Sequence, residues 1–236
     1  MSHILPKTLT EEPLKATGIH LGIRGRVTKD MERFVTGFAP SGNPIIDVNA
    51  ILTRLDSGGK FIVKSENAVL YATDAKFVNA LKSFHEATLI PVVYHRFMPG
   101  CLTNAQSKYY IDANVLIVAD PTNGIPTKIG QALRGDRRAI QEAGDAGIPV
   151  IAVCNTNATL EDVDFCIPAN NAGAKAIATI FYLLARSVQL ERGWIKPEEE
   201  VIDYTTKKPL KIEDFETKIE EPEEDEEENV YKPRPT

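Results

Sequence analysis

The chain has 236 residues, 43% of them hydrophobic and 25% charged, a composition typical of a soluble globular protein with one large or two small domains. Its longest apolar run, residues 177–185, is too short for a membrane span. No signal peptide is expected, and three cysteines without paired spacing exclude a disulfide framework and fit a reducing cytosol. The net charge is −6, but residues 213–228 hold 11 of the 33 acids and one of the 27 bases, so the remainder is mildly basic, which permits nucleic-acid contact without demonstrating it.

The first half of the chain alternates between strand and helix patterns. Residues 1–15 are expected to form an extended arm. Residues 49–55 suit a helix that Ser57-Gly58-Gly59 would stop, and a second helix should carry Phe77, Leu81 and Phe84 on one face. The strands expected in this half cover residues 44–48, 61–63 and 69–72.

The second half continues the alternation. The strands expected here cover residues 89–94, 115–119, 148–153 and 163–168. Helical content is expected near 129–133 and 137–143, and a long final helix should end at Gly193. Beyond Trp194 the chain is rich in Pro and Glu and is predicted to be largely disordered. The predicted parts are an N-terminal arm (1–15), an α/β domain (16–195) and an acidic tail (196–236).

Strands that alternate with helices need crossover connections, which produce a parallel sheet covered on both faces. The predicted fold is therefore α/β, a three-layer αβα arrangement of the flavodoxin or Rossmann-like kind. In such a sheet the carboxyl ends of the strands meet at one edge, where binding groups are placed. Polar loops follow several predicted strands, so this edge is the expected functional rim.

Known nucleotide and metal motifs are not matched. Residues 22–26 lack the third glycine and the spacing of a dinucleotide fingerprint, and residues 57–60 have the wrong polarity for a phosphate loop. No histidine has a second ligand at metal spacing, so neither a metal nor a cofactor is expected. Cys101 near His95 resembles a thiol–imidazole pair, but packing is the better explanation.

The strongest acidic candidates are Asp47, Asp120 and Asp164, at the ends of predicted strands. They could bind a metal or act as bases in an enzyme, or they could cap turns in a binding protein. Because no acid and base pair converges, the pattern favours binding over catalysis. Arg and Lys suit phosphate, and Asn and Thr suit sugar and backbone contacts, as in proteins that bind folded RNA.

An ordered series of motifs resembles one family. The segments are ATGIHLG at 16–22, TKDMERFV at 28–35, RFMPGCLTN at 96–104, VLIVADP at 115–121 and LERG at 190–193. They resemble the S-two family of small-subunit ribosomal proteins, in its archaeal and eukaryotic form (the SA or laminin-receptor-precursor branch). The family-motif loops contain His20, Gly22, Pro99, Gly100, Thr103, Asn104, Asp120, Pro121, Asn155, Asn170 and Asn171.

The resemblance implies a cytoplasmic structural constituent of the small ribosomal subunit, without catalysis or a small-molecule substrate. It would lie between head and body near the mRNA exit, contact ribosomal RNA and neighbouring ribosomal proteins, and support assembly and translation. Four features depart from the family pattern, one of which is Asp74-Ala75-Lys76-Phe77 in place of R-x-x-G-Q. Thr122 replaces an Arg after Asp-Pro, His95 replaces a Gly, and an insertion lies near 122–136.

Within this interpretation a set of cationic side chains is predicted to face RNA phosphates, although each could be an ordinary surface charge. The set is Arg24, Arg26, Lys29, Arg33, Arg96, Arg134, Arg137 and Arg138. Two other functions stay open. One is an enzyme of flavodoxin-like fold that binds a phosphorylated metabolite at Asp120 and Asn155. The other is an interaction module that acts through its acidic tail.

Overall fold

A computed structural model describes residues 11–125 and 134–217 of the chain. At its centre is a five-stranded sheet in which all neighbouring strands are parallel, in the order β4-β3-β5-β6-β7. The strands are β3 (Ala68–Tyr71), β4 (Val92–Val93), β5 (Val115–Val118), β6 (Val150–Cys154) and β7 (Phe165–Pro168). Every residue of β3, β5 and β6 is buried, as continuous apolar runs require when both faces of a sheet are covered.

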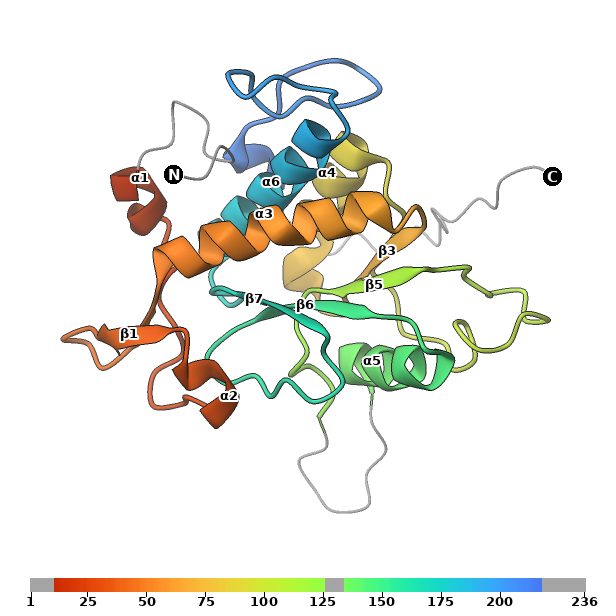
Figure 1. Cartoon of the computed structure of the whole chain (residues 1–236), viewed down its shortest axis with the longest axis horizontal. Helices are drawn as coiled ribbons and strands as arrows, with labels where there is room; N and C mark the ends of the chain where they lie inside the picture. Colours follow the sequence, from red (N-terminus) through yellow and green to blue (C-terminus); the bar gives the residue numbers. More distant parts are fainter. Residues whose placement is uncertain (1–10, 126–133, 218–236) are drawn as a thin grey trace.

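Helices cover both faces of this sheet (Figure 1). The helices α3, α4 and α6 pack together on one face, and α5 lies on the other. Their bounds are α3 (Val48–Lys64), α4 (Val78–Thr88), α5 (Gly135–Ala146) and α6 (Ala174–Glu191), with a short 3-10 helix η1 (Ala75–Phe77) before α4. The predicted three-layer αβα fold is confirmed.

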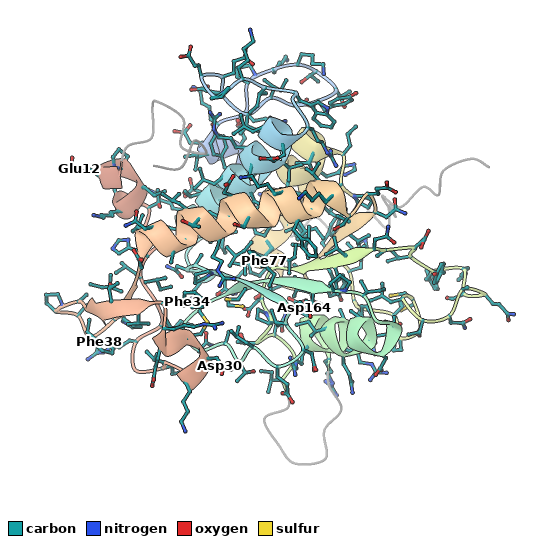
Figure 2. The ribbon with its side chains drawn as sticks, in the orientation of Figure 1. Glu12, Asp30, Phe34, Phe38, Phe77 and Asp164 are labelled. Carbon is teal, nitrogen blue, oxygen red and sulfur yellow. The ribbon has the colours of Figure 1, made fainter. Side chains whose placement is uncertain are left out.

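The core of the helical layer is aromatic. Phe181 of α6 packs edge-to-face on Phe77 and Phe84, with ring centres 6.3 and 6.1 Å apart. Figure 2 labels Phe77 between the helices and the sheet. The predicted apolar face of α4 is therefore confirmed. The predicted strand over 89–94 shortens to β4, because Leu89 caps α4 in the left-handed conformation with φ 57°.

The helix α3 does not end at the glycine pair. It runs through Gly58 and Gly59 to Lys64, so the predicted helix stop and the predicted strand over 61–63 are both wrong. A Cβ built on Gly59 would lie 2.0 Å from Ser187 Oγ and 2.6 Å from Ser187 Cβ, both on α6. The glycine therefore permits close contact between two helices, and its effect on helix propensity is secondary.

The N-terminal region is more ordered than an arm. Residues 11–16 form the helix α1 (Glu11–Ala16), and Leu14 is fully buried, so the predicted extended arm is wrong for residues 11–15; residues 1–10 lie outside the described residues. A short helix α2 (Lys29–Glu32) then leads into a strand that was not predicted, β1 (Val35–Phe38). It pairs antiparallel with β2 (Pro44–Ile46), which makes a separate hairpin instead of another parallel strand.

The predicted disorder from residue 196 is wrong for residues 196–217. This segment folds against α6 and α4, ends in the 3-10 helix η2 (Ile212–Phe215), and buries Val201 and Phe215 completely. Gln189 of α6 donates to the carbonyl of Ile202 and accepts from its N–H. The two buried side chains and the bonds to Gln189 thus outweigh a composition that is typical of disorder. Residues 218–236 and the predicted helix at 129–133 lie outside the described residues.

Candidate functional site

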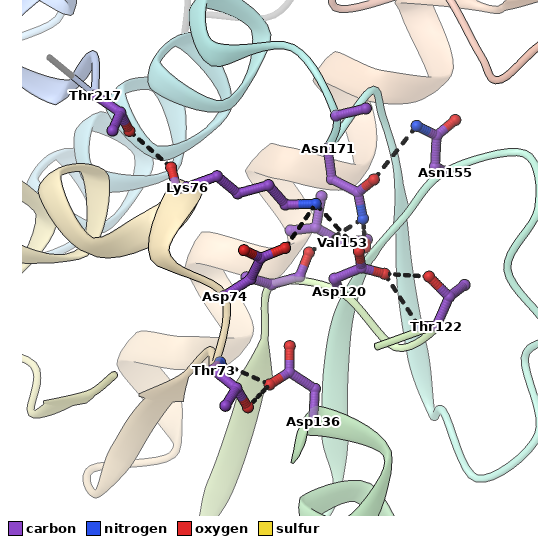
Figure 3. Close-up of polar contacts among 12 residues, drawn as sticks. Thr73, Asp74, Lys76, Asp120, Thr122, Asp136, Val153, Asn155, Asn171 and Thr217 are labelled. Atoms are coloured by element: carbon purple, nitrogen blue, oxygen red, sulfur yellow. Dashed lines mark hydrogen bonds and ion pairs between the residues drawn. The ribbon is translucent and has the colours of Figure 1, made fainter. Parts of the chain in front are cut away.

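The carboxyl ends of the parallel strands converge as the sequence predicts. Thr73 and Asp74 follow β3, Asp120 follows β5, and Asn155 follows β6 (Figure 3). Because β4 lies on one side of β3 while β5, β6 and β7 extend on the other, the strand order reverses between β3 and β5. That reversal is where α/β sheets ordinarily bind ligands.

Three asparagines tie the ends of β5, β6 and β7 together. Asn171 Nδ2 donates to the carbonyls of Ala119 and Val153 at 3.3 and 3.2 Å. Asn155 Nδ2 donates to Asn171 Oδ1 and Asn170 Oδ1, both at 3.3 Å. Asn155 and Asn171 are 1% and 3% exposed, so their amides act within the fold and are closed to a ligand.

The segment that contains His20 and Gly22 covers the ends of β6 and β7. Asn170 Nδ2 donates to Gly18 O at 3.0 Å, and Ile23 N donates to Thr156 Oγ1 at 3.1 Å. A Cβ on Gly22 would lie 2.4 Å from Thr156 Cγ2, so only glycine fits there. Burial, with a smaller contribution from Lys15, lowers the pKa of His20. This family-motif loop is therefore a packing element.

The three acidic candidates bond to backbone groups. Asp47 caps α3 by accepting from Asn49 N at 3.0 Å, and Asp164 accepts from Val150 N at 2.8 Å. Asp120 Oδ1 accepts from the N–H and hydroxyl of Thr122 at 3.0 and 2.6 Å, in the turn that contains buried Pro121. Of the two alternatives for these acids, turn capping fits and a metal or base role does not. Within residues 11–125 and 134–217 no three His, Cys, Asp or Glu side chains form a metal cluster.

Lys76 carries the positive charge at this edge. Its Nζ lies 3.3 Å from Asp74 Oδ2 and 3.5 Å from Asp120 Oδ2. Its backbone carbonyl accepts from Thr217 Oγ1 at 2.7 Å, which joins the C-terminal segment to the strand-end edge. The reversal point is thus occupied by an internal ion-pair network, with Lys76 partly exposed.

A perturbed carboxyl group, which the sequence did not reveal, lies beside this network. Asp136 in α5 is fully buried; its Oδ1 accepts from the N–H and hydroxyl of Thr73 at 2.8 and 2.6 Å, while Oδ2 has no partner among the described residues. Burial, with the negative charges of Asp120 and Asp74, raises the pKa of Asp136 to about 7. In the sequence an acid in the first turn of a helix is an ordinary feature.

Asp136 is expected to make stability depend on pH. Between about pH 4 and 7 the folded state keeps a proton that the unfolded state has released, so the free energy of unfolding falls as pH rises through this window. The variant Asp136→Asn should remove this dependence and exceed the wild type by about 4 kcal/mol at pH 8 but by little at pH 4. Urea denaturation of both proteins across this range measures the difference, and other titrating groups cancel. A difference that is constant with pH would contradict the assignment.

The loop at 96–104 is held by a helix residue that sequence reasoning missed. Glu142 of α5 accepts from Gly100 N at 2.8 Å, Leu102 N at 2.9 Å and Thr103 Oγ1 at 3.3 Å. Gly100 has φ 88°, a conformation that favours glycine, whereas Pro99 and Asn104 are exposed. No sequence spacing could have indicated this contact, because it joins positions about forty residues apart.

The predicted phosphate-facing cations differ in how far they are buried. Six are exposed, Arg137 is buried, and Arg138 is half-buried and donates to Gln141. The exposed residues are Arg24, Arg26, Lys29, Arg33, Arg96 and Arg134. Arg137 is different: it is 6% exposed and bonds to the carboxylates of Glu161 and Asp162 at 2.9 and 3.2 Å. Its guanidinium is already paired with two exposed carboxylates, so it presents little free surface to a phosphate, and its contact with RNA stays a prediction.

The chain is similar to proteins of one family. A model of the family described as Ribosomal protein S2 matches residues 132–190. The Small ribosomal subunit protein uS2 of Nanoarchaeum equitans is 36% identical over 204 residues, which cover 86% of this chain and 92% of that protein. The same protein of Nitrosopumilus maritimus is 34% identical over 225 residues (94% and 99%), and that of Methanococcus maripaludis is 36% identical over 185 residues (78% of each). Within the described residues no helix is long and apolar enough to cross a membrane.

Proposed function

This chain belongs to the ribosomal protein S2 (uS2) family in its archaeal form, and from that premise we propose that it binds small-subunit ribosomal RNA through exposed cations on a rigid α/β block. Its relatives carry the name Small ribosomal subunit protein uS2, which supports a structural role over the enzyme alternative. The proposal extends to contacts with neighbouring ribosomal proteins between head and body near the mRNA exit, in the cytoplasm, in support of assembly and translation.

The proposal rests on a contrast between polar groups that bond within the fold and cations that are exposed to solvent. The amides and carboxylates at the strand-end edge bond within the fold, and a metabolite would find few unsatisfied groups there. Arg24 and Arg26 are exposed, and so are Lys29 in α2 and Arg33, which follows α2. The hairpin that contains β1 lies beside α2 (Figure 1). Exposed cations that are close together in the sequence suit a phosphate backbone, because phosphate contacts position a protein on RNA.

Co-sedimentation with small ribosomal subunits tests the proposal, together with the salt dependence of RNA binding. The double variant Arg24→Gln/Arg26→Gln should reduce the slope of log Kd against log salt by about 1.5, since each phosphate contact contributes roughly 0.7 to 0.9. The matched variant Lys64→Gln removes an exposed charge from α3 and should leave the slope unchanged. An unchanged slope in the double variant would remove these arginines from the interface. Absence of the wild-type protein from purified small subunits would refute the function itself.

A further inference from the structure

A pocket of about 590 Å³ opens on the sheet face that carries α5, beside the loop that joins β4 to β5. Its floor consists of Val69, Tyr71 and Leu116, with Val69 and Leu116 directly opposite on neighbouring strands. Val93 of β4 and residues of the loop 95–111 supply the remaining walls. Its volume is within the range of ordinary ligand sites. The hydroxyl of Tyr71 lies 3.2 Å from Thr73 Oγ1, so the pocket adjoins the strand-end edge.

The walls of this pocket are preformed. Phe97 packs edge-to-face on Tyr71 with ring centres 5.4 Å apart, and the Tyr71 hydroxyl donates to His95 O at 3.1 Å. Glu142 fixes the far wall through its bonds to the loop at 100–103. Burial raises the pKa of the Cys101 thiol to about 12, so this side chain is a neutral, apolar part of the wall. A ligand would therefore meet a rigid apolar interior.

The rim of the pocket is cationic and aromatic. Arg96 and Lys108 are exposed there, and none of the described residues that line the pocket is acidic. Tyr109 is 38% exposed, and the Lys108 ammonium lies 4.7 Å from the centre of its ring. Met98, 44% exposed, adds apolar surface at the same opening. The rim thus combines a flat ring and positive charge above an apolar floor.

We propose that this pocket binds an unpaired nucleotide of single-stranded RNA, with its base against Tyr109 and the apolar interior and its phosphates at Arg96 and Lys108. The inference rests on the proposed RNA-binding function and adds a site and a ligand class to it. Unstacked bases bind aromatic side chains through their π-faces, and flanking cations neutralise the backbone. An exposed ring beside two cations favours a stacked base over an aliphatic protein side chain, and a paired base in a duplex cannot enter the pocket.

Fluorescence anisotropy with the full chain tests the site. The probe is a fluorescein-labelled single-stranded RNA octamer, compared with the same octamer in a duplex. We expect Tyr109→Ala to weaken binding of the single strand roughly tenfold or more, and Tyr109→Phe, which keeps the ring, to change it less than about twofold. Phe61→Ala is the matched control, because Phe61 on α3 is 36% exposed and lies in the opposite helical layer. Photocrosslinking of a 4-thiouridine octamer should label residues within 95–111.

The outcomes separate this inference from the proposed function. Unchanged octamer affinity in Tyr109→Ala, or an equal loss in Phe61→Ala, overturns the pocket while the salt-dependent binding at Arg24 and Arg26 stands. If Tyr109→Ala keeps RNA affinity but loses co-sedimentation with small subunits, the pocket binds a protein and the inference is wrong. If the wild type neither binds RNA nor co-sediments, the proposed function itself fails. Thermal melting confirms that each variant is folded.

Discussion

Replacing Gly59 with alanine is expected to lower the free energy of unfolding by about 3 kcal/mol, at the upper end of the usual effect of overpacking. The added Cβ would lie 2.0 Å from Ser187 Oγ, 2.6 Å from Ser187 Cβ and 3.2 Å from its carbonyl carbon. Rotation of the hydroxyl relieves only the first contact, so α3 and α6 must move apart. These two helices share a large part of the core, and chemical denaturation of Gly59→Ala measures the loss.

Gly144 provides the matched control. It lies in α5, and a Cβ built there meets no atom within 4 Å. Gly144→Ala should therefore stabilise the protein by up to about 1 kcal/mol, as helix propensity predicts. The double variant Gly59→Ala/Ser187→Gly exchanges the small residue between the helices and should recover part of the stability. If Gly59→Ala were as stable as Gly144→Ala, the close helix contact would be disproved.

Replacing Arg186 with methionine is expected to release residues 196–217 from the domain and to lower stability by about 3 kcal/mol. The Arg186 guanidinium on α6 is fully buried and donates to the carbonyls of Glu199 and Pro197, the latter at 2.7 Å. Burial also lowers the pKa of Arg186. Methionine fills much of the volume but removes two hydrogen bonds from a charged donor, which contribute about 1.5–3 kcal/mol each. Hydrogen exchange at residues 196–217 should accelerate.

Lys175→Met is the control for Arg186→Met. It removes a positive charge from the same helix at an exposed position, so exchange in residues 196–217 should stay as in the wild type. Limited proteolysis gives a second measurement, because a released segment becomes a substrate. Protection of residues 196–217 in Arg186→Met equal to that in the wild type would show that the bonds from Arg186 are not needed to hold the segment.

The central sheet was predictable because buried parallel strands consist of continuous apolar runs in the sequence. The runs at 115–119 and 148–153 correspond to β5 and β6, with boundaries shifted by one or two residues. The helix α6 was equally clear from its apolar periodicity. These signals are local, since each run is buried whatever its exact neighbours are.

The predictions were wrong where the local propensity of a segment differs from the structure that tertiary contacts impose on it. Two adjacent glycines disfavour a helix in isolation, yet at Gly58 and Gly59 packing against β7 and α6 outweighs the propensity. Likewise the Pro- and Glu-rich composition after Trp194 indicates disorder, while a few buried side chains hold residues 196–217 in place. Segment averages do not reveal such isolated anchors.

For the candidate site, the sequence predicted the position of the polar loops but not their hydrogen bonds. The convergence of polar loops at the strand ends followed from the predicted parallel sheet and is confirmed. The use of those loops did not follow, because Asn155, Asn171 and Asp120 bond inside the fold. Arg134 and Arg137 look alike in the sequence, yet one is exposed and the other is buried beside Glu161.

The amino-acid order by itself determined the layered α/β class, the family and the position of the polar edge, because hydrophobic periodicity and short motifs depend on neighbouring residues. Tertiary structure alone decided which charges remain free, how Asp136 acquires a pKa of about 7, and where a pocket forms between the sheet and the loop at 95–111. Desolvation and ion pairing depend on the groups that surround a side chain in space, and those groups come from distant parts of the chain.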